Sequence, residues 1–218
     1  LVQHHGVDPR SIVALTFTNK AAREMRERIA HLLGPYGELP YVGTFHGYCL
    51  RLLKSEGQRI NLPPMTLLDD DDQEKLMKSI LARINAPKQY TPRGVLSAIS
   101  RAAQSIRTTV PFDDQFFAQA RDLYAAEKRA ARAADFDDLI AYVARGLQQH
   151  ESWRLAHQSR VRHLLVDEYQ DTNEIQHELL MLMSRAADKS CAIDSLCVVG
   201  DEDQAIYSWR GATTHNII

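Results

Sequence analysis

The amino-acid sequence predicts an α/β fold built on a parallel sheet, with an all-helical subdomain inserted between the second and third strands. Two observations predict it. Short apolar segments alternate with helical patterns near both ends of the 218-residue chain, as is typical of parallel sheets. Between them the pattern is helical throughout, with no strand signal. We therefore expect residues 1–68 and 150–218 to form two parts of one core, and residues 69–149 to form the insertion.

The first strand and helix follow each other closely. Ile12–Thr16 (IVALT) is short, apolar and rich in β-formers, which predicts a buried strand. Apolar residues then recur every three or four positions over residues 22–32, which indicates an amphipathic helix. Asn19 is the predicted N-cap, and Gly34-Pro35 predicts the end of this helix.

The same alternation continues after both segments of the core. We expect strands at residues 41–45, 164–166 and 196–199, and helices at about residues 47–57 and 175–183. The third strand leads directly into Asp167-Glu168, and the fourth into Gly200-Asp201. Open parallel sheets bind ligands outside the carboxyl ends of their strands, so this edge is the predicted site.

Composition sets broad limits on the class of protein. Hydrophobic residues make up 44% and charged residues 25% of the chain, as in ordinary soluble proteins, and the formal net charge is −2. Residues 83–132 hold nine Lys/Arg against four Asp/Glu, which on charge alone favours a solvated helical surface. Three cysteines without paired spacing argue against a disulfide framework or a zinc site. The same cysteines indicate a reducing compartment, and we expect a cytoplasmic protein. With no apolar run of membrane-spanning length, we expect no membrane contact.

The clearest chemical motif is the acid pair after the third strand. An Asp at such a strand end helps to hold Mg²⁺ in phosphoryl-transfer enzymes, and an adjacent Glu can polarise the attacking water. Asp167 and Glu168 fit this Walker B arrangement. The pattern alone leaves a second interpretation open, in which the acids merely terminate a buried strand.

Longer motifs decide between these interpretations. They are LTFTNKAAREMRERI (15–29), GTFHGYCLRLL (43–53), DFDDLI (135–140), VDEYQDTN (166–173) and VVGDEDQAIYSWRGA (198–212). In this order they resemble motif Ia, motif Ib, a segment of the helical insertion, motif II and motif III of the UvrD/Rep/PcrA helicases of superfamily 1. The resemblance spans nearly the whole chain and implies a RecA-like motor core.

The resemblance implies ATP and Mg²⁺ as cofactors. Asp167 would ligate Mg²⁺, and Glu168 would activate water. Gln204 would reach the γ-phosphate and report hydrolysis to the DNA site, because its amide both donates and accepts hydrogen bonds. The alternative for Gln204 is a surface turn residue.

Single-stranded DNA is the implied partner at motif III. Tyr207, Trp209 and Arg210 would face it, since aromatic rings are sequence-tolerant platforms for bases. Core packing is the alternative for the two aromatic residues, and their spacing fits either role.

Motifs Ia and Ib are expected to contribute further DNA contacts. Phe17 would form part of a base pocket, or else pack beneath the following helix. Three polar residues, Thr16, Thr18 and Asn19, would bind phosphates from a turn and a helix N-terminus. Thr44 and His46 would also lie along the DNA, although a lone histidine is often structural. In the basic helical stretch, Arg101 and Arg107 are candidate phosphate contacts that no motif supports.

The expected function is that of an ATP-dependent DNA helicase that moves 3′ to 5′ on single-stranded DNA and acts at junctions with duplex. Nucleoid association and repair or replication partners are implied only by the resemblance. The sequence has no G-x-x-x-x-G-K-[ST] loop, no strand leading into one, and no motifs of a second motor domain, so we expect a fragment inactive on its own. The chain begins without Met, which is not the start expected of a complete protein. A non-catalytic DNA-binding module and a nuclease-coupled relative are the alternatives.

Overall fold

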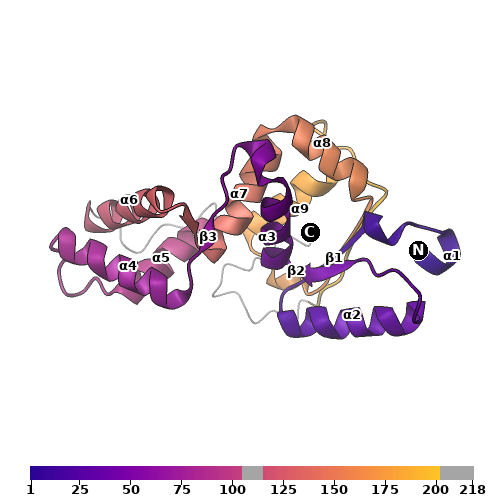
Figure 1. Ribbon diagram of the computed structural model, residues 1–218, viewed down its shortest axis with the longest axis horizontal. Helices are drawn as coiled ribbons and strands as arrows, with labels where there is room; N and C mark the ends of the chain where they lie inside the picture. The colour runs from indigo at the N-terminus through magenta and orange to yellow at the C-terminus, as the bar shows by residue number, and fades with distance from the viewer. Residues whose placement is uncertain (105–114, 202–218) are drawn as a thin grey trace.

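The computed structural model describes residues 1–104 and 115–201, and its main feature is a four-stranded parallel sheet (Figure 1). The strands are β1 (Ile12–Thr16), β2 (Tyr41–Thr44), β5 (His163–Val166) and β6 (Ser195–Val198), in the order β2-β1-β5-β6. A second sheet pairs two short parallel strands, β3 (Thr66–Leu67) and β4 (Ala133–Ala134). A parallel sheet combined with many helices confirms the predicted α/β fold class.

Helices account for most of the remaining described residues. They are α1 (Val2–His5), α2 (Asn19–Leu33), α3 (Phe45–Glu56), α4 (Asp70–Arg83), α5 (Pro92–Gln104), α6 (Gln115–Ala130), α7 (Phe136–Gln149), α8 (Glu151–Arg160) and α9 (Glu174–Ser184). Short 3₁₀ turns cover Pro9–Ser11, Gly57–Ile60 and Tyr169–Asp171. Over residues 1–104 and 115–201, none of the helices has the length and apolar character that crossing a bilayer requires.

The sheet has one face packed against a large hydrophobic core. Side chains of a strand alternate between faces, so Val13 and Leu15 of β1 point the same way as Leu164 and Val166 of the adjacent β5. These four pack with apolar residues of α3, α7, α8 and α9. Helix α2 contacts β1 and β2, on the opposite side of the sheet from α7, α8 and α9 (Figure 1).

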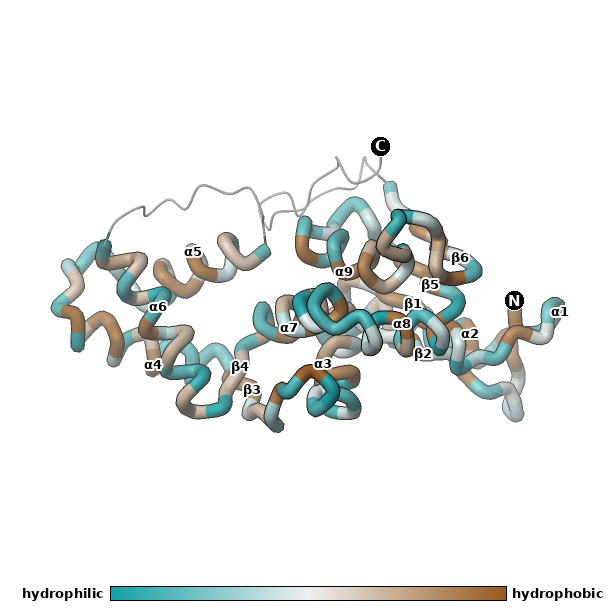
Figure 2. Tube along the Cα trace, turned by 90° about the horizontal axis from the view of Figure 1, so that it is seen from above, coloured by the Kyte–Doolittle hydropathy of each residue, from teal (hydrophilic) through white to brown (hydrophobic). Residues whose placement is uncertain are grey.

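Helices α4, α5 and α6 form a block beside the sheet with a core of their own. Met77, Val95, Phe117 and Tyr124 are among its buried residues. Figure 2 shows this block set apart from the strands of the main sheet, with hydrophobic and hydrophilic residues interspersed along its helices. Helix α7, by contrast, places its buried residues in the core on the sheet. We propose that the inserted subdomain ends near Ala134, and that α7 belongs to the sheet-containing part rather than to an insertion running to residue 149.

Two local predictions need correction. Thr18, not Asn19, caps α2: the Thr18 Oγ1 accepts a hydrogen bond from the Ala21 N–H at 3.1 Å, and Asn19 is the first helical residue. The stretch 69–149 also contains a strand, because β4 pairs with β3. Two alanines are too short a run to produce a strand periodicity. The predicted helix end at Gly34 is confirmed by its φ of 80°, which favours glycine.

Candidate functional site

The carboxyl edge of the sheet brings together segments that are far apart in the sequence. Because the strands are parallel and Leu15 pairs with Val166, the residues that follow β1 and β5 are neighbours. The backbone N–H of Asp167 donates to the Leu15 carbonyl at 2.9 Å. On the other side of β5, the N–H of Tyr169 donates to the Val199 carbonyl at 2.9 Å. The described residues that follow β1, β5 and β6 therefore meet at one edge.

Asp167 lies half-buried at the centre of this edge, where one of its carboxylate oxygens accepts the N–H of Glu168 at 3.1 Å. The described part of the chain holds no cluster of three or more His, Cys, Asp or Glu residues arranged to bind a metal. Mg²⁺ does not require one, because it is usually held by one or two carboxylates together with water and substrate phosphates. Asp167 fits the single protein carboxylate of such a site.

Glu168 has a backbone conformation that non-glycine residues seldom adopt. Its φ of 55° and ψ of 42° lie in the left-handed region. Such strain recurs at functional sites, where the surrounding structure holds it in place. The Glu168 carboxylate accepts a hydrogen bond from the side-chain amide of Gln170 at 2.6 Å. Its direction is therefore set by both the backbone and a neighbouring side chain.

Two helix N-termini open at the same edge. Thr18 caps α2, and Thr44 caps α3 by accepting the N–H of Gly47 at 3.1 Å. Helix N-termini attract phosphates through their free N–H groups and their partial positive charge. Thr18 and Asn19 are exposed at one N-terminus, and Thr44 is half-buried at the other. These positions suit the predicted contacts with a DNA backbone.

Thr16 differs from these residues because its side chain is inaccessible. It is 0% exposed, and its hydroxyl has no hydrogen-bond partner among the described residues. A DNA strand at the surface does not reach a fully buried group, so the geometry separates Thr16 from Thr18 and Asn19.

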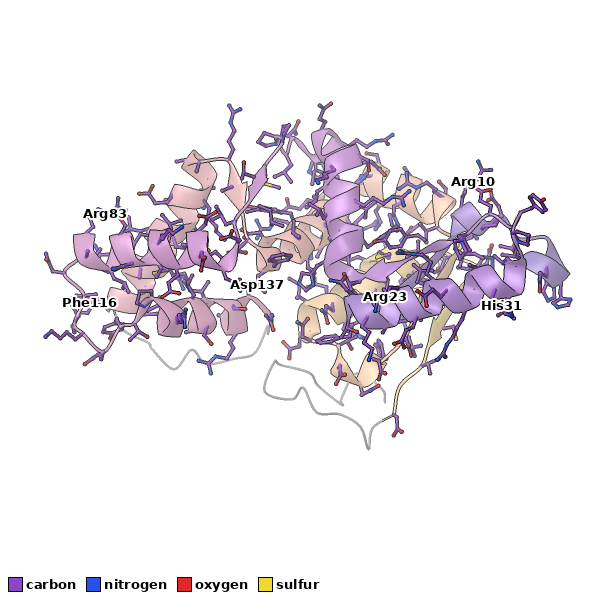
Figure 3. All side chains as sticks on the ribbon, turned by 60° about the horizontal axis from the view of Figure 1, so that its bottom comes forward. Arg10, Arg23, His31, Arg83, Phe116 and Asp137 are labelled. Carbon is purple, nitrogen blue, oxygen red and sulfur yellow. The ribbon has the colours of Figure 1, made fainter. Side chains whose placement is uncertain are left out.

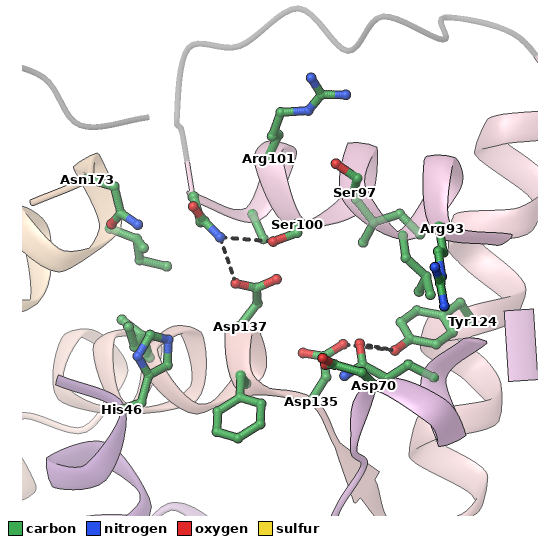
Figure 4. A pocket seen from close by; sticks show the side chains of 18 of the residues that line it. His46, Asp70, Arg93, Ser97, Ser100, Arg101, Tyr124, Asp135, Asp137 and Asn173 are labelled. Carbon is green, nitrogen blue, oxygen red and sulfur yellow. Dashed lines mark hydrogen bonds between the residues drawn. The ribbon is translucent and has the colours of Figure 1, made fainter. Parts of the chain in front are cut away.

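A cleft of about 830 Å³ lies between the sheet edge and the helical block (Figure 4). Phe17 and His46 line it from the sheet side, which brings these two predicted residues together. The ring of His46 meets Phe136 edge to face, with 6.0 Å between the centroids. Burial lowers the pKa of His46, although the charge of Asp137 opposes that effect. The imidazole is therefore neutral at pH 7.

Among the residues that the structure describes, more carboxylates than cations line the cleft. Its acidic residues are Asp70, Asp71, Glu74, Asp135, Asp137 and Asp171, and its Lys/Arg residues are Arg93 and Arg101. Arg93 is already paired with Glu74 at 2.8 Å. Phosphates are therefore disfavoured inside the cleft, whereas uncharged bases are not.

The DFDDLI segment contributes residues that the sequence did not assign. Asp137 lies where the helical block meets the sheet-containing part (Figure 3), and it accepts a hydrogen bond from Gln104 at 3.0 Å. Burial raises the pKa of Asp137, while hydrogen bonds from Ser100 and Gln104 act in the opposite direction. The match of this segment to the insertion motif was the available signal, but it carried no role for single residues.

Comparison with known protein families gives a match over the whole chain. The model of the UvrD/REP helicase N-terminal domain matches residues 1–218. The chain belongs to this family. Similar relatives are the ATP-dependent DNA helicases PcrA of Staphylococcus aureus (strain NCTC 8325 / PS 47) and Staphylococcus epidermidis (strain ATCC 12228 / FDA PCI 1200). Each is 35% identical over 227 residues, covering 100% of this chain and 30% of the relative.

Membership in the UvrD/REP family confirms the resemblance drawn from the motifs and supports a DNA helicase at family level. The chain spans about 30% of the length of the curated relatives that it matches. Four residues with predicted roles lie outside the described residues, namely Gln204, Tyr207, Trp209 and Arg210. Arg107 does as well. Their roles stay predictions.

Proposed function

We propose that this UvrD/REP domain supplies part of the ATP-hydrolysing and DNA-binding surface of a helicase that moves 3′ to 5′ along single-stranded DNA. The observation that carries the proposal is the pair Asp167 and Glu168 at the carboxyl end of an inner strand, with the Glu168 carboxylate held by a hydrogen bond. The direction of movement rests on the motifs alone. Action at duplex junctions and a role in repair or replication rest on the same resemblance.

In the proposed reaction, each acid has one task. Asp167 would hold Mg²⁺, which neutralises charge on the phosphates when bound. Glu168 would accept a proton from water as the water oxygen bonds to the γ-phosphorus. The bond between that phosphorus and the bridging oxygen of ADP breaks, and ADP and inorganic phosphate leave. Gln204 would contact the γ-phosphate, so that its hydrogen bonds change when this phosphate departs.

The DNA would lie along the two helix N-termini and over the cleft. Thr18, Asn19 and Thr44 are placed to meet phosphates, and Phe17 and His46 are placed to meet bases. The acidic lining of the cleft supports this division, because it repels phosphates but not bases. Tyr207, Trp209 and Arg210 would extend the same surface.

The test of this proposal is Glu168→Gln in the complete protein that contains residues 1–218. Glutamine keeps the shape of the side chain and removes its basicity, so DNA-stimulated ATP hydrolysis should fall on the order of 10²–10⁴-fold. Binding of ATP should be retained. Glu178→Gln, the same change in the middle of α9, is the matched control and should hydrolyse ATP normally. Near-normal hydrolysis by Glu168→Gln would contradict the proposed role. Residues 1–218 alone should not hydrolyse ATP, since their sequence lacks the glycine-rich phosphate loop.

A further inference from the structure

Gln170 is a buried side chain that joins two segments of the proposed site. It follows Glu168 by two residues and is 1% exposed. Its Nε2 donates to the Glu168 carboxylate at 2.6 Å. Its Oε1 accepts the backbone N–H of Asp201, beyond the end of β6, at 3.0 Å. One amide therefore links the acid after β5 to the chain after β6.

The chemistry of the two partners fixes the orientation of this amide. A backbone N–H only donates, so the atom facing Asp201 is the oxygen. An ionised carboxylate only accepts, so the atom facing Glu168 is the nitrogen. Rotating the amide by 180° would lose both hydrogen bonds. Leaving buried polar groups without partners is unfavourable. Gln170 is thus held in one orientation by both ends.

Gln170 also packs tightly against Gly200, which follows β6. A Cβ atom added to Gly200 would lie 2.6 Å from the Oε1 of Gln170 and 3.1 Å from its backbone nitrogen. Only glycine fits there without displacing Gln170. The hydrogen bond from Tyr169 to Val199 fixes the same two segments one residue earlier. A shift of residues 199–201 would therefore shift the Gln170 amide.

We infer that Gln170 is a positioning residue that sets the direction of the Glu168 carboxylate according to the place of the Gly200–Asp201 segment. The inference rests on the proposed role of Glu168 as the base. Asp201 precedes Gln204 by three residues in the sequence. The segment that is hydrogen-bonded to Gln170 therefore leads into the residue predicted to contact the γ-phosphate. Gln170 does not itself touch the reacting atoms. Through its two hydrogen bonds, the position of the chain after β6 determines the direction of the Glu168 carboxylate after β5.

The first test compares Gln170→Met with Gln158→Met in the complete protein. Both changes remove a buried amide with two hydrogen bonds, but Gln158 lies in α8 and donates to the carbonyls of Leu182 and Arg185. Gln170→Met should lower kcat for ATP roughly 10- to 100-fold, because small misplacements of a catalytic group are costly. KM for ATP and single-stranded DNA affinity should stay unchanged. Gln158→Met should retain kcat and lose only stability.

The second test uses Gln170→Glu, which keeps the length of the side chain. Its carboxylate still accepts the Asp201 N–H, but it presents an acceptor to Glu168 where the amide presents a donor. Two adjacent carboxylates repel each other, so the Glu168 side chain should leave its present direction. Gln170→Glu should therefore lose kcat at least as far as Gln170→Met, whereas a purely structural role would leave kcat intact in a variant that keeps the bond to Asp201.

The decisive test is the double variant Glu168→Gln/Gln170→Met. If Gln170 acts through Glu168, the double variant should hydrolyse ATP no more slowly than Glu168→Gln alone. Losses that multiply, or a normal kcat in Gln170→Met, would overturn the inference. Normal hydrolysis by Glu168→Gln alone would instead overturn the proposed function. If circular dichroism shows Gln170→Met unfolded, Gly200→Ala perturbs the same contact from the β6 side and should show the same loss of kcat.

Discussion

Replacing Lys128 with methionine should destabilise the junction between the helical block and the rest of the chain. The Lys128 ammonium lies 2.6 Å from Asp135 and 2.5 Å from Asp138, and it sits 4.6 Å from the centre of the Tyr124 ring. The exposed fractions of the three charged side chains are 8% for Lys128, 8% for Asp135 and 21% for Asp138. Methionine preserves most of the volume of lysine, so the main loss is the charge.

The expected magnitude follows from what remains behind. Burial disfavours the charged form of Lys128, but the two carboxylates outweigh this effect and raise its pKa, so it is cationic at pH 7. Without it, two partly or fully buried carboxylates face each other without a counter-charge. Removing one partner from a buried ion pair typically costs about 3–5 kcal/mol. The loss should shrink in acid, where protonation of the carboxylates relieves their repulsion.

Urea unfolding followed by circular dichroism measures this loss, with Arg83→Met as the matched control. Arg83 of α4 pairs with Glu127 of α6 at 2.8 Å, within the helical block, and these two side chains are 52% and 39% exposed. A surface pair of this kind contributes roughly 0–1 kcal/mol. If Lys128→Met loses no more stability than Arg83→Met, the buried network does not stabilise the junction, and the argument from burial is wrong.

Two further predictions concern a buried histidine and a tryptophan of motif III. Burial, reinforced by the charge of Arg160, lowers the pKa of His157 from 6.5 to about 4. The neutral imidazole therefore contributes fully to the stability of the fold above pH 6.5, and this contribution is lost as the pH falls toward 4. The free energy of unfolding should fall by about 3 kcal/mol over this pH range. Unfolding measured as a function of pH should show no such fall in His157→Gln. Trp209→Ala should weaken single-stranded DNA binding by roughly 1–3 kcal/mol at every base sequence tested by fluorescence anisotropy, and unchanged binding by a folded variant would assign Trp209 to the core.

The sequence predicted the strands of the main sheet well because each is a short apolar run. Their ends agree with the structure to within one residue, and Ile12–Thr16 agrees at both ends. The position of Asp167 and Glu168 followed from the same pattern, since a parallel sheet collects its strand ends at one edge. These features are local in the sequence and depend on burial, and a run of apolar residues indicates burial directly.

Other features could not be predicted because they depend on partners far away in the sequence. Helix α8 was missed, since its buried residues are Trp153, His157 and Gln158, and two of these are polar. The hydrogen bond between Gln170 and Asp201 spans 31 residues and leaves no periodic signal. Thr16 was expected at the DNA on the basis of its motif, but its burial depends on packing that a motif does not encode.

Helix α7 explains how the helical block and the sheet edge are joined. Its N-terminal end contacts the block: the Asp135 side chain caps the helix and accepts a hydrogen bond from Lys128 of α6. Its later turns place Val143 and Leu147 in the core on the sheet. One helix therefore contacts both parts, through its N-terminal end on one side and its later turns on the other. Phe136 and Asp137, in the first turn, also line the cleft beside His46.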